Sequence, residues 1–189
     1  YLCDLAAWGA DVIPSVFALP ENQAVQNILR ERSWQEAVIK PAVGQSGRAV
    51  TRITAASPPP DWPAYPQGVI VQPYIREIEQ AGETSLIFFN GTFSHAVLRR
   101  PPQGEWRANS AYGVEIRPAA PSETVVRTAC RVLDLLPQMP VYARVDGTII
   151  GGRLLLNELE LIEPALYLHT AQGAAERFAA VLTEWTKAV

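Results

Sequence analysis

The sequence predicts an α+β fold in which antiparallel hairpins form the sheet and helices cover one face of it. Three observations predict this class. Short β-branched runs come in pairs joined by glycine-containing turns, helical patterns lie between these pairs, and 48% of the 189 residues are hydrophobic. Tight turns join antiparallel strands, and the interspersed helices need a sheet face on which to bury their apolar side. We therefore expect one domain or two closely associated subdomains, as in an ordinary globular protein.

The first part of the chain predicts two helices and a small sheet. Apolar residues at helical spacing indicate a helix over 1–8, which Gly9 ends, and a second helix over 21–32. Residues 57–66 are rich in proline and predict a surface connection, because proline has no amide hydrogen for a strand ladder. The strands expected from β-branched runs lie at 11–16, 37–40, 49–53 and 68–72.

The remainder of the chain predicts two hairpins and two more helices. Asn90-Gly91 separates two apolar runs and is the strongest short hairpin signal in the sequence. Helical periodicity extends over 122–136 and 172–186, and residues 101–112 indicate a polar loop. The other strands expected here lie at 85–89, 93–98, 141–150 and 153–161.

Composition and charge exclude several classes of protein. The net charge of −3 provides no basic surface for non-specific nucleic-acid binding. No apolar run reaches the ~18 residues of a membrane span. The two cysteines, Cys3 and Cys130, cannot build a disulfide framework, and no Cys/His cluster suggests zinc. A reducing, cytoplasmic location is therefore expected, with no nucleic-acid or membrane partner.

The densest chemistry lies on the last predicted hairpin, around Gly151-Gly152. Residues two apart on a strand share a face, so Arg144 projects with Asp146, and Glu158 projects with Glu160. A two-residue turn would place the two pairs on opposite faces, whereas an odd-length turn would place all four side chains on one face. Three carboxylates on one face would suit Mg²⁺, which prefers oxygen ligands. The alternative is a solvated strand face with an arginine counterion.

A lysine ends the predicted strand 37–40, and a small glycine turn follows four residues later. Glycines allow backbone amides to turn toward an anion, and Lys40 adds a point charge suited to phosphate. The pattern lacks the spacing and the following helix of a Walker A motif. The alternative is a simple hairpin loop over Gly44–Gly47.

A histidine lies on the predicted strand 93–98. Pairing across the Asn90-Gly91 turn places His95 opposite Leu86, on a face shared with Phe88, Phe93 and Arg99. His95 is then either a histidine packed in a sheet or a substrate contact beside the arginine pair that ends its strand. That pair is, in turn, either a substrate contact or a solvated strand end.

Taken in order, these pieces resemble the ATP-grasp superfamily. Residues 38–47 resemble its strand lysine and mobile glycine loop, and residues 71–75 resemble the segment that lines its adenine pocket. Residues 143–146 and 156–158 resemble the metal-binding strands of D-alanine–D-alanine ligase. Residues 82–109 are more similar to bacterial glutathione synthetase. The resemblance implies two α+β lobes with antiparallel sheets that hold ATP between them, with the small lobe at about 10–72 and the large lobe at about 73–189 plus the N-terminal helix.

The resemblance also implies how the nucleotide would be bound. A lysine and backbone amides of the glycine loop would contact the phosphates, and the adenine would be met partly through backbone groups. The two family comparisons point to different glutamates for the ribose. The residues concerned are Lys40, Gly44, Gln45, Ser46 and Gly47 at the phosphates, Gln72, Pro73, Tyr74 and Ile75 at the adenine, and Glu79 or Glu83 at the ribose.

Metal, catalytic and substrate residues follow from the same resemblance. Asp146, Glu158 and Glu160 would hold Mg²⁺, with Mn²⁺ as an allowed substitute. Glu160 departs from the family pattern, because asparagine usually stands there, although a carboxylate still supplies a ligand oxygen. Arg144 and Arg100 would face the charge of the reacting phosphate. The implied substrate contacts are Arg107, Asn109, Arg99 and His95.

The activity implied is an ATP-dependent ligase that joins a small-molecule carboxylate to an amine through an acyl phosphate, releasing ADP and phosphate, with substrates derived from amino acids. Two alternatives remain open: a nucleotide-binding module that acts through protein partners, and a kinase-like phosphotransferase. In the superfamily, a further ATP-binding lysine or arginine and a substrate-facing domain precede the segment that Tyr1 begins. We therefore expect the activity of this chain alone to depend on them. The sequence leaves the substrate and a homo-oligomeric state open.

Overall fold

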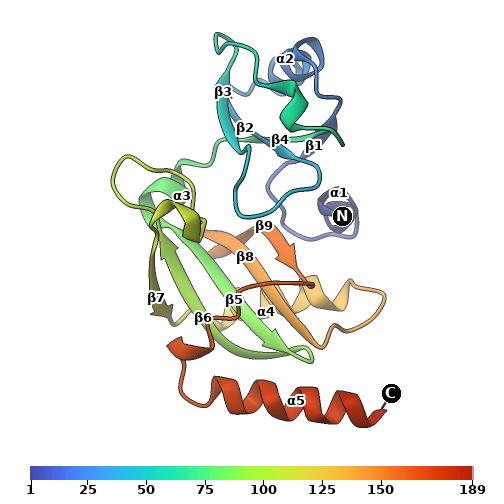
Figure 1. Ribbon diagram of the computed structural model, residues 1–189, viewed down its shortest axis with the longest axis vertical. Coiled ribbons are helices and arrows are strands. Elements are labelled where there is room, and N and C mark those ends of the chain that lie inside the picture. The colour runs from blue at the N-terminus through green and yellow to red at the C-terminus, as the bar shows by residue number, and fades with distance from the viewer. Residues whose placement is uncertain (189) are drawn as a thin grey trace. The chain divides into compact units, whose positions relative to one another are not determined.

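The computed structural model describes residues 1–188 and confirms the α+β class (Figure 1). The chain forms two compact units. The larger unit comprises Tyr1–Val12, Glu77–Ala108 and the chain from Tyr112 onward, and the smaller unit comprises Ile13–Arg76 with Asn109–Ala111. Each unit contains its own antiparallel sheet and its own apolar core. Within residues 1–188, no helix combines the length and the apolar character that crossing a membrane requires.

The smaller unit is a four-stranded sheet in the order β1-β4-β2-β3, with one face covered by a helix. The helix packs Val25 and Leu29 against Ile39 and Val71 of the sheet. The predicted hairpin around the glycine loop is confirmed, because β2 pairs antiparallel with β3. Its elements are β1 (Val16–Ala18), α2 (Asn22–Glu31), β2 (Glu36–Pro41), β3 (Thr51–Thr54), a short 3₁₀ turn (Trp62–Ala64) and β4 (Val69–Pro73).

The strand predicted over 11–16 is wrong in its position. Val12 forms an isolated parallel bridge with Leu156, and the first strand begins later, at Val16. Pro14 explains the shift, because it cannot donate a ladder hydrogen bond in the middle of the predicted strand. The hydroxyl of Ser15 bonds the carbonyl of Ile13 at 2.7 Å and fixes the chain locally before β1 begins.

The larger unit is a five-stranded antiparallel sheet in the order β7-β6-β5-β8-β9. The Asn90-Gly91 hairpin is confirmed: both residues have positive φ, of 45° and 74°, as a two-residue turn between paired strands requires. The elements are α1 (Leu2–Ala7), α3 (Arg76–Ala81, its first residue in the smaller unit), β5 (Glu83–Phe89), β6 (Thr92–Arg100), β7 (Glu115–Ala119), α4 (Glu123–Asp134), β8 (Tyr142–Ile150), β9 (Arg153–Glu160) and α5 (Ala174–Ala188), with a 3₁₀ turn at Leu168–Thr170. A further 3₁₀ turn, Ser110–Tyr112, has its first two residues in the smaller unit.

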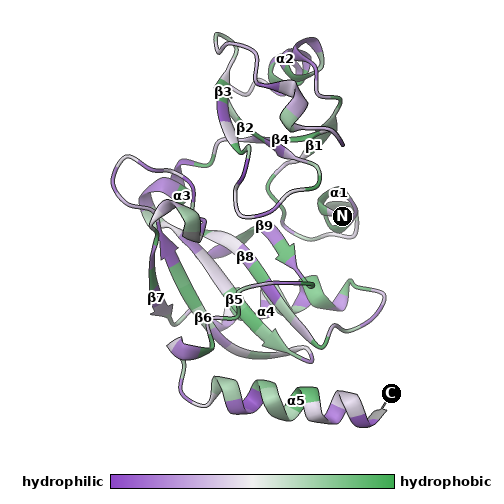
Figure 2. Cartoon of the chain, viewed as in Figure 1, coloured by the Kyte–Doolittle hydropathy of each residue, from purple (hydrophilic) through white to green (hydrophobic). Residues whose placement is uncertain are grey.

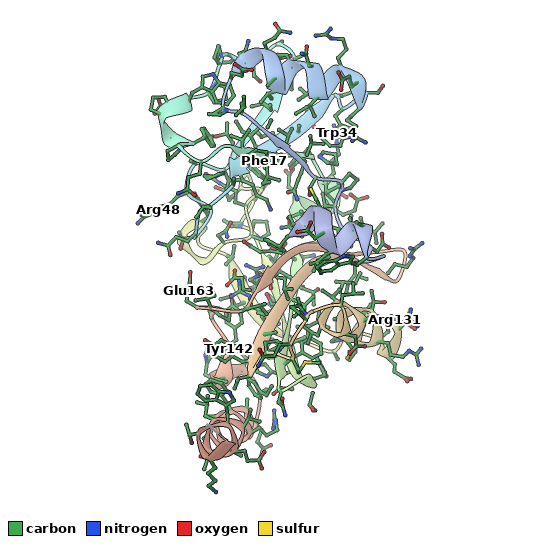
Figure 3. The ribbon with its side chains drawn as sticks, turned by 90° about the vertical axis from the view of Figure 1, so that its right-hand side faces the viewer. Phe17, Trp34, Arg48, Arg131, Tyr142 and Glu163 are labelled. Atoms are coloured by element: carbon green, nitrogen blue, oxygen red, sulfur yellow. The ribbon has the colours of Figure 1, made fainter. Side chains whose placement is uncertain are left out.

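Helices cover both faces of this sheet, and not one face as the sequence predicts. On one face, α1 and α4 pack against a core that includes Leu86 and Phe88. On the other face, Phe178 of α5 packs against Phe89 and Tyr142. Figure 1 shows α5 beside the sheet, and Figure 3 labels Tyr142. Green and purple residues alternate along α5 in Figure 2, as expected of a helix with one buried side. The reason is β5, whose residues are all buried and therefore need cover on both faces.

Two elements have no counterpart in the sequence prediction. The helix α3 is short, and the strand β7 contains Pro118, which argues against a strand in the middle of a sheet. In the structure β7 is an edge strand that pairs with β6 alone. One side of an edge strand has no neighbouring strand. A missing amide hydrogen on that side costs little stability, because it breaks no ladder hydrogen bond.

Candidate active site

The acidic hairpin β8–β9 brings its charged side chains together by a route that the turn alone does not predict. The turn has two residues, because Ile150 pairs with Arg153. A two-residue turn predicts that the acidic pairs lie on opposite faces. Instead, a β-bulge shifts the pairing between Asp146 and Gly147, so that Asp146 lies opposite Glu158. Further along the same ladder Arg144 faces Glu160, and the four side chains share one face.

The leucines of β9 and a glycine of β8 explain the bulge. Leu154 and Leu156 are in the main core, and Leu159 and Leu161 pack against the same core. Successive core leucines are therefore two, three and two residues apart. An extra residue in the strand accommodates the interval of three, because it returns the next leucine to the core face. Gly147 allows the close approach, because a Cβ atom there would overlap the carbonyl oxygen of Leu155. Without the bulge, both glutamates would enter the core.

The three carboxylates form a group that could hold a metal ion. One oxygen each from Asp146, Glu158 and Glu160 lies within 4.8 Å of the others. Asp146 is fully buried, whereas the glutamates are half-buried. Oxygen ligands and the lack of histidine or cysteine in the group suit Mg²⁺ or Mn²⁺.

Two arginines and a fourth carboxylate complete the site. Arg144 bonds both oxygens of Asp146, at 2.9 Å and 2.8 Å, and also pairs with Glu160. Arg99 pairs with Asp146 at 2.9 Å and with Glu83 at 2.6 Å. With all these side chains ionised, the carboxylates outnumber the guanidinium groups by two. The surplus equals the charge of one divalent cation, so the donor set fits such an ion.

The pKa values follow from burial and from these ion pairs. Burial raises the pKa of Asp146, but Arg99 and Arg144 outweigh this effect and hold it below its ordinary value. Burial raises the pKa of Glu160 from 4.5 to about 7, although Arg144 opposes this shift. Asp146 is therefore ionised at neutral pH, whereas Glu160 gains charge readily when a cation arrives.

The two glutamates predicted as alternatives at the ribose differ sharply. Glu83 is 4% exposed, and both its oxygens are occupied, one by Arg99 and the other by the Asn157 amide at 2.5 Å. Glu79 lies on α3 and is exposed. Of the two carboxylates, Glu79 is the exposed one, and that of Glu83 is engaged within the protein.

The predicted position of His95 is wrong. A bulge at Ser94 pairs His95 with Ile87, not Leu86, and turns its ring away from Phe88 and Phe93 toward the other face. There Nε2 donates to the carbonyl of Leu166 at 2.9 Å and Nδ1 contacts the Ser94 hydroxyl at 3.0 Å. Burial lowers the pKa of His95, which keeps the ring neutral. These contacts are those of a packed histidine.

The loop between β6 and β7 carries the remaining arginine candidates. Glu105 forms a two-point ion pair with Arg107, at 2.9 Å and 2.8 Å, and accepts hydrogen bonds from two backbone amides of the loop. The Arg107 guanidinium also lies 3.6 Å from the centroid of the Tyr112 ring. Arg100 is exposed and donates to the carbonyl of Gln80 at 3.3 Å, and Asn109 is half-buried. Arg107 is therefore held in one orientation.

The candidates for nucleotide binding in the smaller unit lie at strand ends and in loops. Lys40 is near the end of β2. The residues of the glycine loop, Gly44–Gly47, are largely exposed, and Ser46 and Gly47 have positive φ. Gln72 is buried and donates to the Ser15 hydroxyl at 2.9 Å, so the backbone is what this position can offer a ligand. Pro73, Tyr74 and Ile75 are half-buried.

The sequence prediction assigned no role to Glu105, Asn157, Gly147 or Tyr167. Glu105 and Arg107 are two residues apart, a spacing that could have suggested a local ion pair. Gly147 lies within a predicted strand, which is a known signal of a bulge. Tyr167, whose ring centroid lies 5.7 Å from the Arg144 guanidinium, gives no signal in the sequence, because a long connection separates it from β9.

The comparisons with known proteins agree with this fold. A family model described as the prokaryotic glutathione synthetase ATP-grasp domain matches residues 5–165. The cycloserine biosynthesis protein DcsG of Streptomyces lavendulae is 33% identical, over 99% of this chain and 69% of the relative. The crystal structure of D-cycloserine synthetase DcsG superposes with a TM-score of 0.83 at 30% identity, covering 97% of this chain and 68% of that one.

A more distant structure shares the fold. The D-alanine–D-alanine ligase of Bacillus anthracis, solved in complex with ATP, has a TM-score of 0.67 at 17% identity, over 95% of this chain and 60% of that chain. The family match covers most of the sequence, and the described elements include two antiparallel sheets and the acidic hairpin. The chain belongs to the family of the prokaryotic glutathione synthetase ATP-grasp domain, within the ATP-grasp ligases.

Proposed function

We propose that this chain binds ATP with Mg²⁺ and forms a C–N bond between a carboxylate and an amine through an acyl phosphate. The carboxylate group of Asp146, Glu158 and Glu160, with ligand oxygens within 4.8 Å of one another, is the observation that supports it. These residues would hold Mg²⁺, or Mn²⁺ in its place. When bound, the ion would neutralise charge on the ATP phosphates.

The proposal also assigns residues to the parts of the nucleotide. Lys40 would pair with the phosphates, and amides of the Gly44–Gly47 loop would surround them. Residues 72–75 would meet the adenine, with Gln72 acting through its backbone because its side chain is already engaged. Glu79 would bind the ribose, since Glu83 is buried and paired.

The chemistry requires positioning and charge neutralisation more than covalent help from the protein. A substrate carboxylate oxygen would attack the γ-phosphorus of ATP, the bond to the β-phosphate oxygen would break, and ADP would leave. An amine nitrogen would then attack the acyl carbon, inorganic phosphate would leave, and the nitrogen would lose its proton. Arg100, which is exposed, would meet the reacting phosphate, and Arg144, which is buried and bonded to Asp146, would add positive charge from among the metal ligands. Each such preorganised donor can lower the barrier by ~3 kcal/mol.

The substrate proposed is derived from an amino acid. The similar protein DcsG is named as a D-cycloserine synthetase, which motivates a small amino-acid-derived substrate here. Arg107, oriented by Glu105, and the neighbouring Asn109 would bind a carboxylate of that substrate. His95 is left out, because both its ring nitrogens are engaged within the protein.

A hydroxylamine trapping assay tests this proposal. The full-length protein that carries this chain is mixed with ATP, Mg²⁺ and a panel of amino-acid-derived carboxylates, and hydroxylamine intercepts an acyl phosphate as a hydroxamate. We expect hydroxamate and ADP in equal amounts, and a loss of at least a hundredfold in the Asp146→Asn variant. An Arg127→Gln variant on the exposed side of α4 serves as the control and should react normally. ADP release with a phosphorylated hydroxyl product and no hydroxamate would contradict the proposal in favour of a kinase.

A further inference from the structure

Arg99 occupies an unusual place among the charged residues of the larger unit. It is 3% exposed, although it lies next to the last residue of β6, where the polar loop begins. Its guanidinium contacts three different segments. Nη2 lies 2.6 Å from Glu83 Oε2 on β5 and 2.9 Å from Asp146 Oδ2 on β8, and Nη1 donates to the carbonyl of Ala108 at 3.1 Å.

The contacts of Arg99 continue into β9. The second oxygen of Glu83 accepts a hydrogen bond from the side-chain amide of Asn157. Asn157 is the extra residue of the β9 bulge, directly before Glu158. A hydrogen-bonded chain therefore crosses four strands, from Arg99 on β6 through Glu83 to Asn157 on β9, with Asp146 as a branch. It reaches two of the three carboxylates of the proposed metal group, Asp146 directly and Glu158 through its neighbour.

The Ala108 contact links this chain to the polar loop. Ala108 lies between Arg107 and Asn109, the two residues proposed to bind the substrate carboxylate. Its carbonyl is fixed by the same guanidinium that holds Asp146. A planar guanidinium can donate in several fixed directions at once, which a lysine ammonium on a flexible stem cannot reproduce.

We propose that Arg99 is a positioning residue that couples the metal carboxylate Asp146 to the substrate loop through Ala108. This inference rests on the proposed function for the identity of the metal and substrate groups. It replaces the substrate contact predicted for Arg99 from the sequence, because the guanidinium is buried and already engaged with protein oxygens. Glu83 holds the same guanidinium nitrogen that contacts Asp146, and Asn157 in turn holds the second oxygen of Glu83.

The test compares Arg99→Lys with the unchanged chain in two measurements. Mn²⁺ binding is titrated by the loss of the free-ion electron paramagnetic resonance signal, and hydrogen exchange is followed in peptides that span residues 104–112. Lysine keeps the charge but cannot reach all three partners. We expect Mn²⁺ to bind about tenfold more weakly, as is typical when an outer partner of a metal ligand is changed, and faster exchange in the loop.

A matched control separates positioning from general stability. Val97→Ala lies two residues away on the same strand, removes buried apolar volume and leaves the Arg99 contacts in place. It should lower the melting temperature without changing Mn²⁺ affinity or loop exchange. Mn²⁺ affinity and loop exchange in Arg99→Lys that match those of Val97→Ala would overturn the inference.

Two further outcomes are decisive. If Arg99→Lys does not fold, Asn157→Ala replaces it, because the Asn157 side chain is only half-buried. Mn²⁺ binding that is at least threefold weaker in Asn157→Ala supports the inference, and unchanged Mn²⁺ binding overturns it. If the unchanged chain binds no Mn²⁺, the proposed function fails at its metal site. Loop exchange then decides the role of Arg99 alone: faster exchange in Arg99→Lys supports the link to Ala108, and unchanged exchange rejects it.

Discussion

Arg144, Arg99 and Arg107 have the same side chain but three different surroundings. Arg144 contacts two of the proposed metal ligands and lies beside the ring of Tyr167. Arg99 is enclosed by protein oxygens on β5, β8 and the polar loop. Arg107 is half-buried on that loop and is oriented by Glu105. The different roles proposed for these arginines therefore depend on their partners and not on the residue type: Arg144 acts near the phosphate, Arg99 positions other residues, and Arg107 binds the substrate.

The Glu105–Arg107 pair makes a prediction about pH. The hydrogen bonds from Arg107 lower the pKa of Glu105 from 4.5 to about 2. A lowered pKa means that the pair stabilises the folded chain above pH 4.5 and loses this effect as the pH falls through about 2. Glu105→Gln should therefore reduce the free energy of unfolding by up to ~1 kcal/mol above pH 4.5, since the pair is partly exposed.

Urea unfolding of both proteins between pH 2 and pH 6 measures this difference. The two unfolding curves should converge toward pH 2. A difference that stays constant across the range would show that the carboxylate charge of Glu105 is not what holds Arg107.

At the scale of elements, the sequence predicted most strands and helices but not the feature that assembles the site. The hairpin 141–161 was expected, yet turn length alone left the face of Glu158 and Glu160 open. The leucine spacing at 154, 156, 159 and 161, read together with Gly147, contains the information, because only a bulge keeps all four leucines in the core. The contacts of Arg99 and Glu83 could not be predicted, since they depend on strand order and side-chain burial.

Gly147 makes a prediction about the bulge. A methyl group in Gly147→Ala would overlap the Leu155 carbonyl oxygen and lie 2.8 Å from Leu154 Cδ1. The strand cannot relieve this overlap by losing the bulge without burying two glutamates. We expect a loss of at least ~1–3 kcal/mol in the free energy of unfolding, the usual cost of overpacking.

Urea unfolding with Gly44→Ala as the control checks this expectation. Gly44 lies in an exposed loop and lacks a positive φ. A Cβ atom there would lie 3.2 Å from Pro41 Cβ, which a shift of a few tenths of an ångström in the loop relieves, so the substitution should change stability by less than about 1 kcal/mol. Equal stability of Gly147→Ala and the unchanged chain would mean that the close approach at the bulge is not required.

At the scale of the whole molecule, the chain forms two units that each have a core of their own. The smaller unit carries Lys40 and the glycine loop, and the larger unit carries the carboxylates and arginines. The family was predicted from the order of these segments along the chain and is confirmed by the match over residues 5–165. Neither the match nor the fold names the substrate, because pockets for small molecules are set by individual side chains.

Thermal unfolding with and without Mg²⁺ and ATP tests whether this chain binds ATP in a metal-dependent manner. A ligand at a hundredfold its dissociation constant stabilises the folded state by ~2.7 kcal/mol, which corresponds to a rise of about 5–10 °C for a chain of this size. The account predicts such a rise with both components present and a much smaller rise with either alone. The rise should be lost in Asp146→Asn and reduced in Lys40→Ala. The same rise in Asp146→Asn, or no rise in the unchanged chain, would contradict it.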